Sequence, residues 1–251
     1  MSKERLADTE IVSEWLGKND IQAVLWDLDG TSIKTGKVFT DAMDEYIAFV
    51  SKKVTSIPPE TMKADIEHID REAYKTFAVS SKRWTVVVEK AAELYGKEYL
   101  PALSEGLPIF MNIYKTIPEP FPLAIETMET FRSATKKMAL VTHAEEGWSN
   151  IKIDGLNIRR LFDYINIVDA TKHKGPDAWQ KALDFFEVKA ENALVIGDSL
   201  SGDIGAAHKI GVKNKIYIPS TWVVYNTGEI PEGTTTIHGI DKIVGELAGQ
   251  I

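Results

Sequence analysis

The sequence contains no cysteine, and this absence removes several classes of protein at once. Disulfide-stabilised domains, thiolate metal sites, iron–sulfur proteins and enzymes with a cysteine nucleophile all need the missing side chain. An excess of basic residues is missing too, since 29 Lys and Arg against 37 Asp and Glu give a formal net charge of −8. Without a basic field, we expect no nucleic acid as a partner.

Long apolar runs are also absent. The N-terminal segment lacks the apolar run of a signal peptide, and no stretch approaches the ~20 apolar residues of a membrane span. We therefore expect a cytoplasmic protein with no membrane partner, while its oligomeric state stays open. The 251 residues, 44% of them hydrophobic, are enough for one or two domains with a sizeable core.

The hydrophobic pattern divides the chain into three regions. Residues 1–20 are expected to form an N-terminal helical extension, and residues 21–37 and 117–251 an α/β core. Between them, residues 38–116 show helical spacing without strand–turn alternation, which predicts an inserted all-helical domain with helices at 38–54, 83–95 and 100–114. Three prolines within residues 118–122 make a stiff connector at its end.

The core region alternates short apolar runs with amphipathic segments. The runs cover residues 21–26, 138–141, 165–168, 193–196 and 215–218, with a weaker one at 235–237. This alternation predicts a Rossmann-like parallel sheet with helices on both faces, one of them at 202–210. Ligands bind beyond the carboxyl ends of the strands in such sheets, so the residues after each run are the functional candidates.

Polar residues follow the first four apolar runs: Asp27 and Asp29, then Thr142 and His143, then Lys174, then Asp198 and Asp203. Four carboxylates at one sheet edge repel one another unless a cation compensates them. Oxygen ligands favour Mg²⁺, and a metal, a lysine and a hydroxyl together suit a phosphoryl group. The sequence lacks both G-x-x-x-x-G-K-[ST] and G-x-G-x-x-G, the loops of other phosphate-binding classes.

Four ordered motifs resemble those of the haloacid dehalogenase (HAD) superfamily, and most nearly its phosphoglycolate phosphatase-like branch. They are A-V-L-W-D-L-D-G-T at 23–31, A-L-V-T at 139–142, Lys174 with its following Pro176, and A-L-V-I-G-D-S-L-S-G-D-I at 193–204. The resemblance covers residue 21 to the end, with the helical insert weakly matched. It implies that residues 38–116 are a cap that closes over the substrate.

The resemblance assigns chemical roles to the strand-end residues. Asp27 would be the nucleophile that forms an aspartyl-phosphate, and Asp29 would protonate the leaving group and then activate water. Thr142, the backbone N–H of His143 and Lys174 would bind the phosphate. Mg²⁺ would be held by Asp27, by the backbone carbonyl of Asp29 and by Asp198, while Asp203 would orient Lys174 or a metal-bound water.

Some assignments stay open. Gly175 separates the lysine from the proline, which departs from the family pattern and makes Lys172 an alternative to Lys174. The His143 side chain either touches the leaving group or is a bystander. In the cap, Lys82, Arg83 and Trp84 either face the substrate or begin a solvated helix.

The expected function is Mg²⁺-dependent hydrolysis of a small phosphorylated metabolite. An acid at position 29 argues against dehalogenation, because a departing halide needs no proton. Two alternatives remain: a sugar phosphomutase resembling β-phosphoglucomutase, and a catalytically idle binding protein that keeps the HAD fold.

Overall fold

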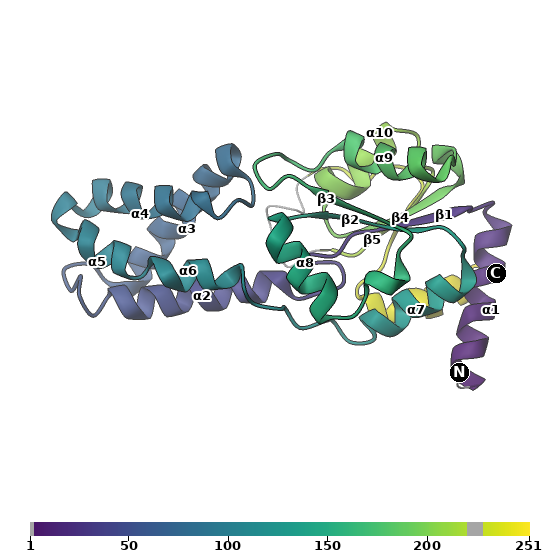
Figure 1. Cartoon of the computed structure of the whole chain (residues 1–251), viewed down its shortest axis with the longest axis horizontal. Coiled ribbons are helices and arrows are strands. Elements are labelled where there is room, and N and C mark those ends of the chain that lie inside the picture. Colours follow the sequence, from purple (N-terminus) through teal and green to yellow (C-terminus); the bar gives the residue numbers. More distant parts are fainter. Residues whose placement is uncertain (1–2, 220–227) are drawn as a thin grey trace.

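The computed structural model describes residues 3–219 and 228–251, which form a sheet-containing core and a helical bundle beside it (Figure 1). All pairings in the sheet are parallel, in the order β3-β2-β1-β4-β5-β6. The strands are β1 (Ala23–Trp26), β2 (Met138–His143), β3 (Tyr164–Val168), β4 (Ala193–Gly197), β5 (Asn214–Tyr217) and β6 (Thr234–Thr236). The predicted Rossmann-like parallel sheet with an added helical cap is confirmed.

Strands β1 and β4 end within one residue of each other in register, and β2 runs beyond them. Trp26, the last residue of β1, pairs with Leu140 of β2 and Ile196 of β4, so the segments after them meet at one edge. Strand β2 extends two residues beyond its expected end, because Thr142 and His143 continue the ladder with β3. These two residues are therefore part of the strand, and the expectation that they follow it is wrong.

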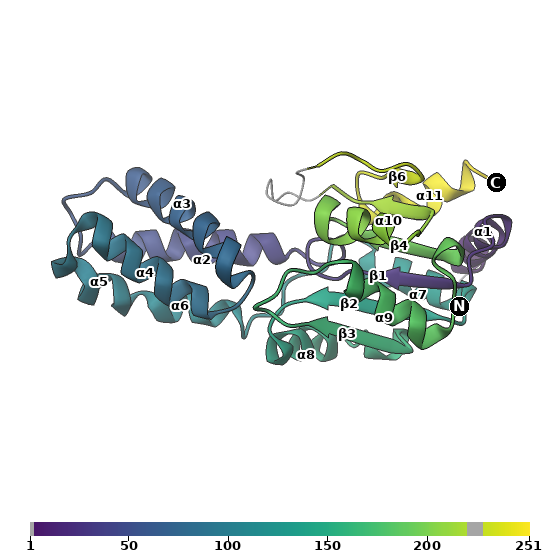
Figure 2. The ribbon, with the colours of Figure 1, turned by 90° about the horizontal axis from the view of Figure 1, so that it is seen from above.

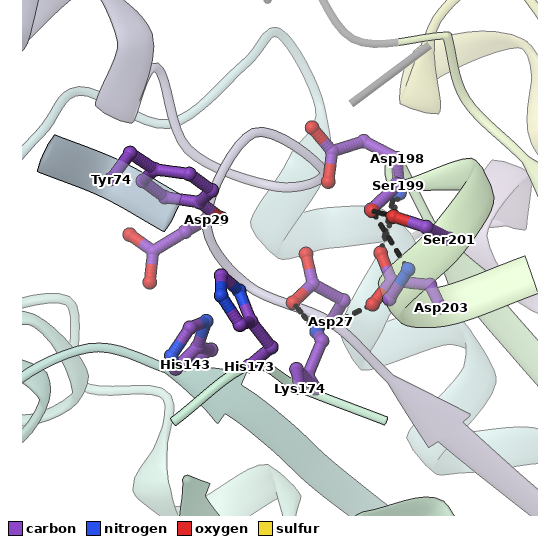
Figure 3. Close-up of a pocket in the computed structure, with 11 residues that line it drawn as sticks. Asp27, Asp29, Tyr74, His143, His173, Lys174, Asp198, Ser199, Ser201 and Asp203 are labelled. Carbon is purple, nitrogen blue, oxygen red and sulfur yellow. Dashed lines mark hydrogen bonds and ion pairs between the residues drawn. The ribbon is translucent and has the colours of Figure 1, made fainter. Parts of the chain in front are cut away.

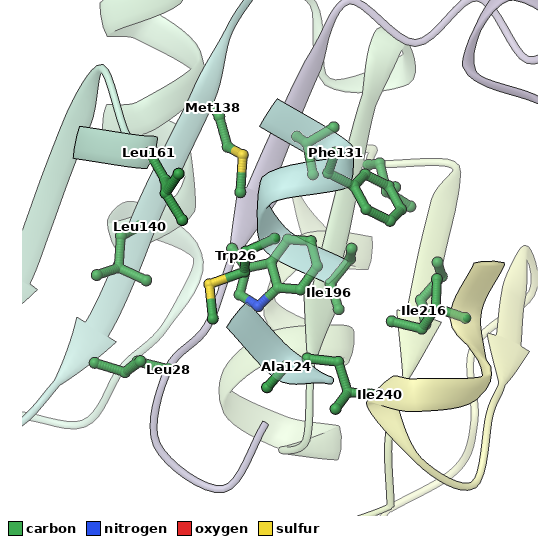
Figure 4. Packing of buried hydrophobic residues seen from close by; sticks show 14 of the residues in the cluster. Trp26, Leu28, Ala124, Phe131, Met138, Leu140, Leu161, Ile196, Ile216 and Ile240 are labelled. Carbon is green, nitrogen blue, oxygen red and sulfur yellow. The ribbon is translucent and has the colours of Figure 1, made fainter. Parts of the chain in front are cut away.

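Each face of the sheet has its own layer of helices (Figure 1). Val24 and Trp26 point to a layer formed by α1 (Lys3–Lys18), α7 (Ala124–Ala134), α8 (Glu146–Gly155) and α11 (Ile243–Ala248). Ala23 and Leu25 point to the other layer, formed by α9 (Pro176–Phe186) and α10 (Gly205–Lys209). This is the two-residue period of a strand buried on both faces. In the first layer the ring of Phe131 meets Trp26 edge-on at 5.3 Å (Figure 4).

The N-terminal helix α1 belongs to the core. It lies against α7 and α11, with Val12 and Leu16 buried in the first layer. The indole nitrogen of Trp15 donates a hydrogen bond to Gln250 at 3.0 Å, and Lys18 donates to the backbone oxygens of the last two residues. The helix therefore holds the C-terminal end of the chain in place.

The bundle contains α2 (Thr35–Val50), α3 (Pro59–Phe77), α4 (Lys82–Tyr95), α5 (Leu100–Glu105) and α6 (Leu107–Ile113). The helix α3 was not among the predicted ones. The helix expected at 100–114 is divided at Gly106, because Pro108 has no N–H to continue the hydrogen-bonding of α5. The rings of Trp84 and Tyr46 stack on the two sides of Phe110, at 3.9 and 4.4 Å, and form the centre of the bundle.

Two connecting segments run side by side between the bundle and the core (Figure 2). Ile33 pairs antiparallel with Pro120, and the N–H of Lys34 donates to the carbonyl of Glu119 at 2.8 Å. The proline-rich connector is therefore fixed to the loop that carries Asp27 and Asp29.

The other helical elements of the described residues are short: 3₁₀ turns at Lys97–Tyr99, Arg159–Leu161, Ala190–Asn192 and Ile240–Lys242, and a π-helical turn at Leu200–Ile204. The expected helix 202–210 is therefore a π turn followed by the short α10. Within residues 3–219 and 228–251, no helix has both the length and the apolar character needed to cross a bilayer.

Candidate active site

The loop after β1 holds Asp27 in a buried position, 2% exposed, at the sheet edge. The hydroxyl of Thr31 donates to one carboxylate oxygen at 2.6 Å, and the Lys174 ammonium is paired with the other. Gly30 has a φ of 86°, and a Cβ there would lie 2.2 Å from a carboxylate oxygen of Asp198. A glycine is therefore required for Asp198 to approach the loop.

The segment after β4 places Asp198 and Asp203 beside Asp27 (Figure 3). Asp203 lies in the π-helical turn and is fully buried. One of its oxygens accepts the N–H groups of Asp198 and Ser199, at 3.1 and 2.9 Å, and the other pairs with Lys174 at 2.5 Å. Both carboxylate oxygens of Asp203 are therefore engaged, one by the loop after β4 and the other by Lys174.

With all its carboxylates ionised, this edge carries more negative than positive charge. The carboxylates of Asp27, Asp198 and Asp203 are buried, with ligand atoms within 4.8 Å of one another, and the Lys174 ammonium pairs with Asp27 and Asp203. The sequence of segment 220–227 contains no charged residue. A divalent cation would neutralise the two remaining negative charges, and all the donors are oxygens, so the site fits Mg²⁺.

The protonation of this cluster follows from burial and charge. Burial raises the pKa of Asp27 above its usual range, against the opposing effect of Lys174. Burial alone would lower the pKa of Lys174, but Asp203 and Asp27 outweigh it and raise that pKa, so the side chain stays an ammonium. Lys172 is exposed and lies outside this cavity, so Lys174 is the lysine that the structure brings to Asp27.

Asp29 lies on the other side of the cavity, and three side chains of the described residues donate hydrogen bonds to its carboxylate. The Lys152 ammonium contacts both carboxylate oxygens at 2.6 Å, and the hydroxyls of Thr35 and Thr142 donate to them at 2.6 and 3.0 Å. Thr142 thus contacts Asp29 in this structure. Burial would raise the pKa of Asp29, but Lys152 and the hydroxyl bonds outweigh it and lower that pKa.

Sequence reasoning missed Lys152. It lies in α8, four residues after Trp148, whose ring covers the ammonium at 4.0 Å, and its side chain is fully buried. A lysine four residues after an inward-facing tryptophan lies on the same face of the helix. This spacing is the sequence pattern that could have indicated that Lys152 points inward. Lys152 also has a lowered pKa, because burial outweighs the attraction of Asp29.

We predict that Lys152→Met lowers the free energy of unfolding by about 3 kcal/mol, because it leaves Asp29 charged and buried without its partner. The double variant Asp29→Asn/Lys152→Met should recover part of this loss. Urea unfolding of the single and double variants measures the coupling. Lys213→Met is the matched control, since Lys213 forms an exposed ion pair with Glu191 and should change the stability by less than about 1 kcal/mol. Additive effects of the two active-site substitutions would contradict the prediction.

His143 ends β2 and lines the same cavity, which has a volume of about 340 Å³. Its Nε2 is buried without a partner among the described residues. Burial, with the nearby Lys174 charge, lowers the pKa of His143 to about 4. The ring is therefore neutral near pH 7.

This pKa predicts a pH dependence of stability. An unfolded histidine takes up a proton near its ordinary pKa of 6.5, whereas folded His143 does so only near 4. The unfolded state therefore binds more protons than the folded state between these pH values. As a result, the contribution of His143 to the stability of the fold is complete above pH 6.5 and is lost as the pH falls towards 4. Between about pH 7 and pH 4, we expect the free energy of unfolding of wild type to fall by about 3 kcal/mol more than that of His143→Gln, as measured by urea unfolding. Equal losses in the two proteins would contradict this assignment.

The cap reaches the cavity through Tyr74 of α3, which was not predicted. The three cap candidates do not line it: Lys82 is exposed, Arg83 is buried against Asp70 at 2.6 Å, and Trp84 is part of the bundle centre. The expectation that Arg83 and Trp84 begin a solvated helix is also wrong, because both side chains are 1% exposed.

Cap and core touch through the loop between α3 and α4. The N–H of Val79 donates to the carbonyl of Ala170 at 3.2 Å, and the N–H of Ser81 donates to the Glu145 carboxylate at 2.7 Å. The Tyr74 ring lies edge-on to His173 at 5.5 Å. The cavity is therefore closed on one side by the cap.

Comparison with known proteins agrees with this geometry. The family model described as haloacid dehalogenase-like hydrolase matches residues 24–216. The chain is 25% identical over 204 residues to a phosphoglycolate phosphatase of Aquifex aeolicus, covering 78% of this chain and 84% of the relative. It is 24% identical over 195 residues to a glyceraldehyde 3-phosphate phosphatase of Pyrococcus abyssi, covering 77% and 79%.

The fold is also found in solved structures. A haloacid dehalogenase-like family hydrolase from Xanthomonas campestris superposes with a TM-score of 0.70 at 22% identity, over 92% of this chain and 93% of that one. Because the family model covers well over half of the sequence, the chain belongs to the haloacid dehalogenase-like hydrolases.

Proposed function

We propose that this hydrolase is a Mg²⁺-dependent phosphatase that acts on a small phosphomonoester through an aspartyl-phosphate on Asp27. The observation that carries the proposal is the position of Asp27, buried between Thr31 and Lys174 and beside Asp198. The relatives named as phosphatases of phosphoglycolate and glyceraldehyde 3-phosphate support the reaction class.

In the first step, a carboxylate oxygen of Asp27 attacks phosphorus, and the bond from phosphorus to the ester oxygen breaks. Lys174 neutralises the phosphoryl oxygens and is itself held by Asp203. Bound by Asp27, Asp198 and the Asp29 backbone carbonyl, Mg²⁺ would supply further positive charge to the phosphoryl group.

Asp29 handles the proton in both steps. It donates a proton to the departing alkoxide, and then takes one from the water that attacks the phosphorylated Asp27 and breaks the phosphorus–aspartate bond. Before substrate binds, Lys152 keeps Asp29 ionised. The negative phosphoryl group opposes that effect when it arrives, because a nearby like charge raises the pKa of a carboxyl.

A chromogenic aryl phosphate tests the proposal directly. We expect phosphate release with Mg²⁺, loss of activity after chelation, and recovery when Mg²⁺ is restored. Asp198→Asn should lower the activity by about 100-fold or more and raise the Mg²⁺ concentration needed, because it removes a metal ligand. The matched control is Asp41→Asn, since Asp41 is exposed on α2 and pairs only with Lys37 in the described structure.

The same assay separates the alternatives. No release with any phosphomonoester, together with retained binding of phosphate ligands, would identify a binding protein. Isomerisation of a sugar phosphate that is faster than phosphate release would identify a phosphomutase. Either result would overturn the proposed hydrolysis.

A further inference from the structure

Lys152 is a buried charge that lies beside the cavity without lining it. Its side chain is 0% exposed, and the ring of Trp148, one turn earlier in α8, covers the ammonium at 4.0 Å. Lysine is almost never fully buried unless it is paired, because removing its charge from water is costly. What Lys152 does therefore depends on the group that it contacts.

The ammonium of Lys152 bridges the carboxylate of Asp29. Its Nζ lies 2.6 Å from each of the two oxygens, and the hydroxyls of Thr35 and Thr142 add one hydrogen bond to each oxygen. The terminal torsion of an aspartate is broad when nothing holds it. A donor shared by both oxygens opposes this rotation, because turning the carboxylate would lengthen one of the two contacts. Lys152 therefore fixes the plane of the Asp29 carboxylate.

Stability alone does not account for this pair. A buried ion pair adds little stability compared with apolar side chains of similar size, because both charges lose their hydration. A second buried lysine, Lys215, is 2% exposed and donates to the backbone carbonyls of Val212 and Lys213 at 2.8 and 2.9 Å. Lys152 differs in that its partner is the carboxylate of a residue that lines the cavity.

The proposed reaction depends on the direction of the Asp29 carboxylate. In-line attack by Asp27 puts the departing oxygen on the far side of phosphorus, where Asp29 gives it a proton. Figure 3 shows Asp29 across the cavity from Asp198 and Asp203. A catalytic group has to be held within about 0.5 Å and 20° of its productive geometry, by neighbours that are themselves fixed. The buried bridge from Lys152 meets this requirement.

We propose that Lys152 is a positioning residue of the reaction, which holds the carboxylate of Asp29 towards the oxygen that leaves phosphorus. The proposal rests on the proposed phosphatase function and adds a residue from outside the cavity lining to it. Lys152 acts through Asp29, so its loss should slow the step in which the leaving oxygen takes a proton. A leaving group that departs without a proton should be insensitive to it.

The test compares two esters of similar size, para-nitrophenyl phosphate and benzyl phosphate. The first releases a phenolate that needs no proton, and the second releases an alkoxide that does. The first step is followed under single-turnover conditions as release of nitrophenol or benzyl alcohol. In Lys152→Met we expect its rate constant to fall by about 100-fold for benzyl phosphate and by less than about threefold for para-nitrophenyl phosphate. Lys152→Gln, whose amide N–H donates to one oxygen, should keep part of the benzyl phosphate rate.

Lys215→Met is the matched control, because it also removes a buried ammonium and Lys215 does not line the cavity. We expect it to change both esters by a similar factor. All variants are compared at a temperature at which circular dichroism shows them folded, and Lys152→Gln alone decides if Lys152→Met does not fold.

Equal losses for the two esters in the folded Lys152 variants, or no loss for benzyl phosphate, would overturn the proposal. A loss confined to benzyl phosphate in Lys215→Met would also overturn it, as would a wild type that releases nitrophenol but no benzyl alcohol. Absence of aryl phosphate hydrolysis by wild type would instead refute the phosphatase function, so the two failures are distinguishable.

Discussion

Replacing Asp27 by asparagine is expected to lower phosphate release by about four orders of magnitude or more. An amide is not a nucleophile towards phosphorus, and it also removes a carboxylate from the proposed metal site. Losses of this size are typical when the covalent nucleophile of an enzyme is removed. Steady-state kinetics with an aryl phosphate at saturating Mg²⁺ measures the effect.

The fold should tolerate Asp27→Asn. The amide has nearly the same shape as the carboxylate, and Lys174 keeps its ion pair with Asp203. Removing a carboxylate whose pKa is raised by burial also relieves part of a desolvation cost. We therefore expect a Tm close to that of wild type. A variant with wild-type structure and more than about a tenth of wild-type activity would refute the role of Asp27 as nucleophile.

Replacing Asp29 by asparagine is expected to lower turnover of alkyl phosphates by about 100- to 10,000-fold. The loss should be smaller for the first step with an aryl phosphate, because a phenolate departs without a proton. The second step still needs a base to activate water, so the phosphorylated enzyme should accumulate. A pre-steady-state burst of phenol release followed by slow turnover is the expected signature.

A stability measurement must accompany Asp29→Asn, because the substitution leaves Lys152 buried beside a neutral amide. The double variant Asp29→Asn/Lys152→Met removes that unpaired charge and should keep the kinetic defect. Equal losses for aryl and alkyl phosphates with no burst, in a variant that is folded, would contradict the acid–base role of Asp29.

The sequence predicted most of what positions the site. The buried runs that end at Trp26 and Ile196 predicted neighbouring parallel strands, and these pair in the structure. Parallel pairing alone then requires the segments after them to meet, which is why Asp27 and Asp198 could be placed together. The choice between Lys172 and Lys174 is not readable from the sequence, because their spacing from Pro176 does not say which side chain turns inward; in the structure Lys174 contacts Asp27.

The missed residues are those placed by tertiary packing. Lys152 is 123 residues from Asp29 in the sequence and meets it only because α8, which carries both Lys152 and Trp148, packs against the core beside Asp29. Tyr74 lies on α3, which was not predicted because its many polar residues and the prolines at its start make the helical periodicity of its apolar residues hard to recognise. Arg83 resembled a solvated charge because its partner Asp70 lies on a different helix of the cap. The partners in these contacts are far apart in the sequence or on different elements, so local periodicity does not say which residues meet.

Covalent phosphorylation of Asp27 is the central claim, and trapping it is the most direct measurement. Asp29→Asn is incubated with an aryl phosphate and Mg²⁺, quenched in acid, digested and analysed by peptide mass spectrometry. We predict a phosphoryl group on the peptide that contains Asp27, removed by hydroxylamine as expected of an acyl phosphate, and absent from Asp27→Asn. A phosphoryl group on a different residue such as His143, or turnover of the aryl phosphate with an unmodified Asp27 at every time point, would contradict the account.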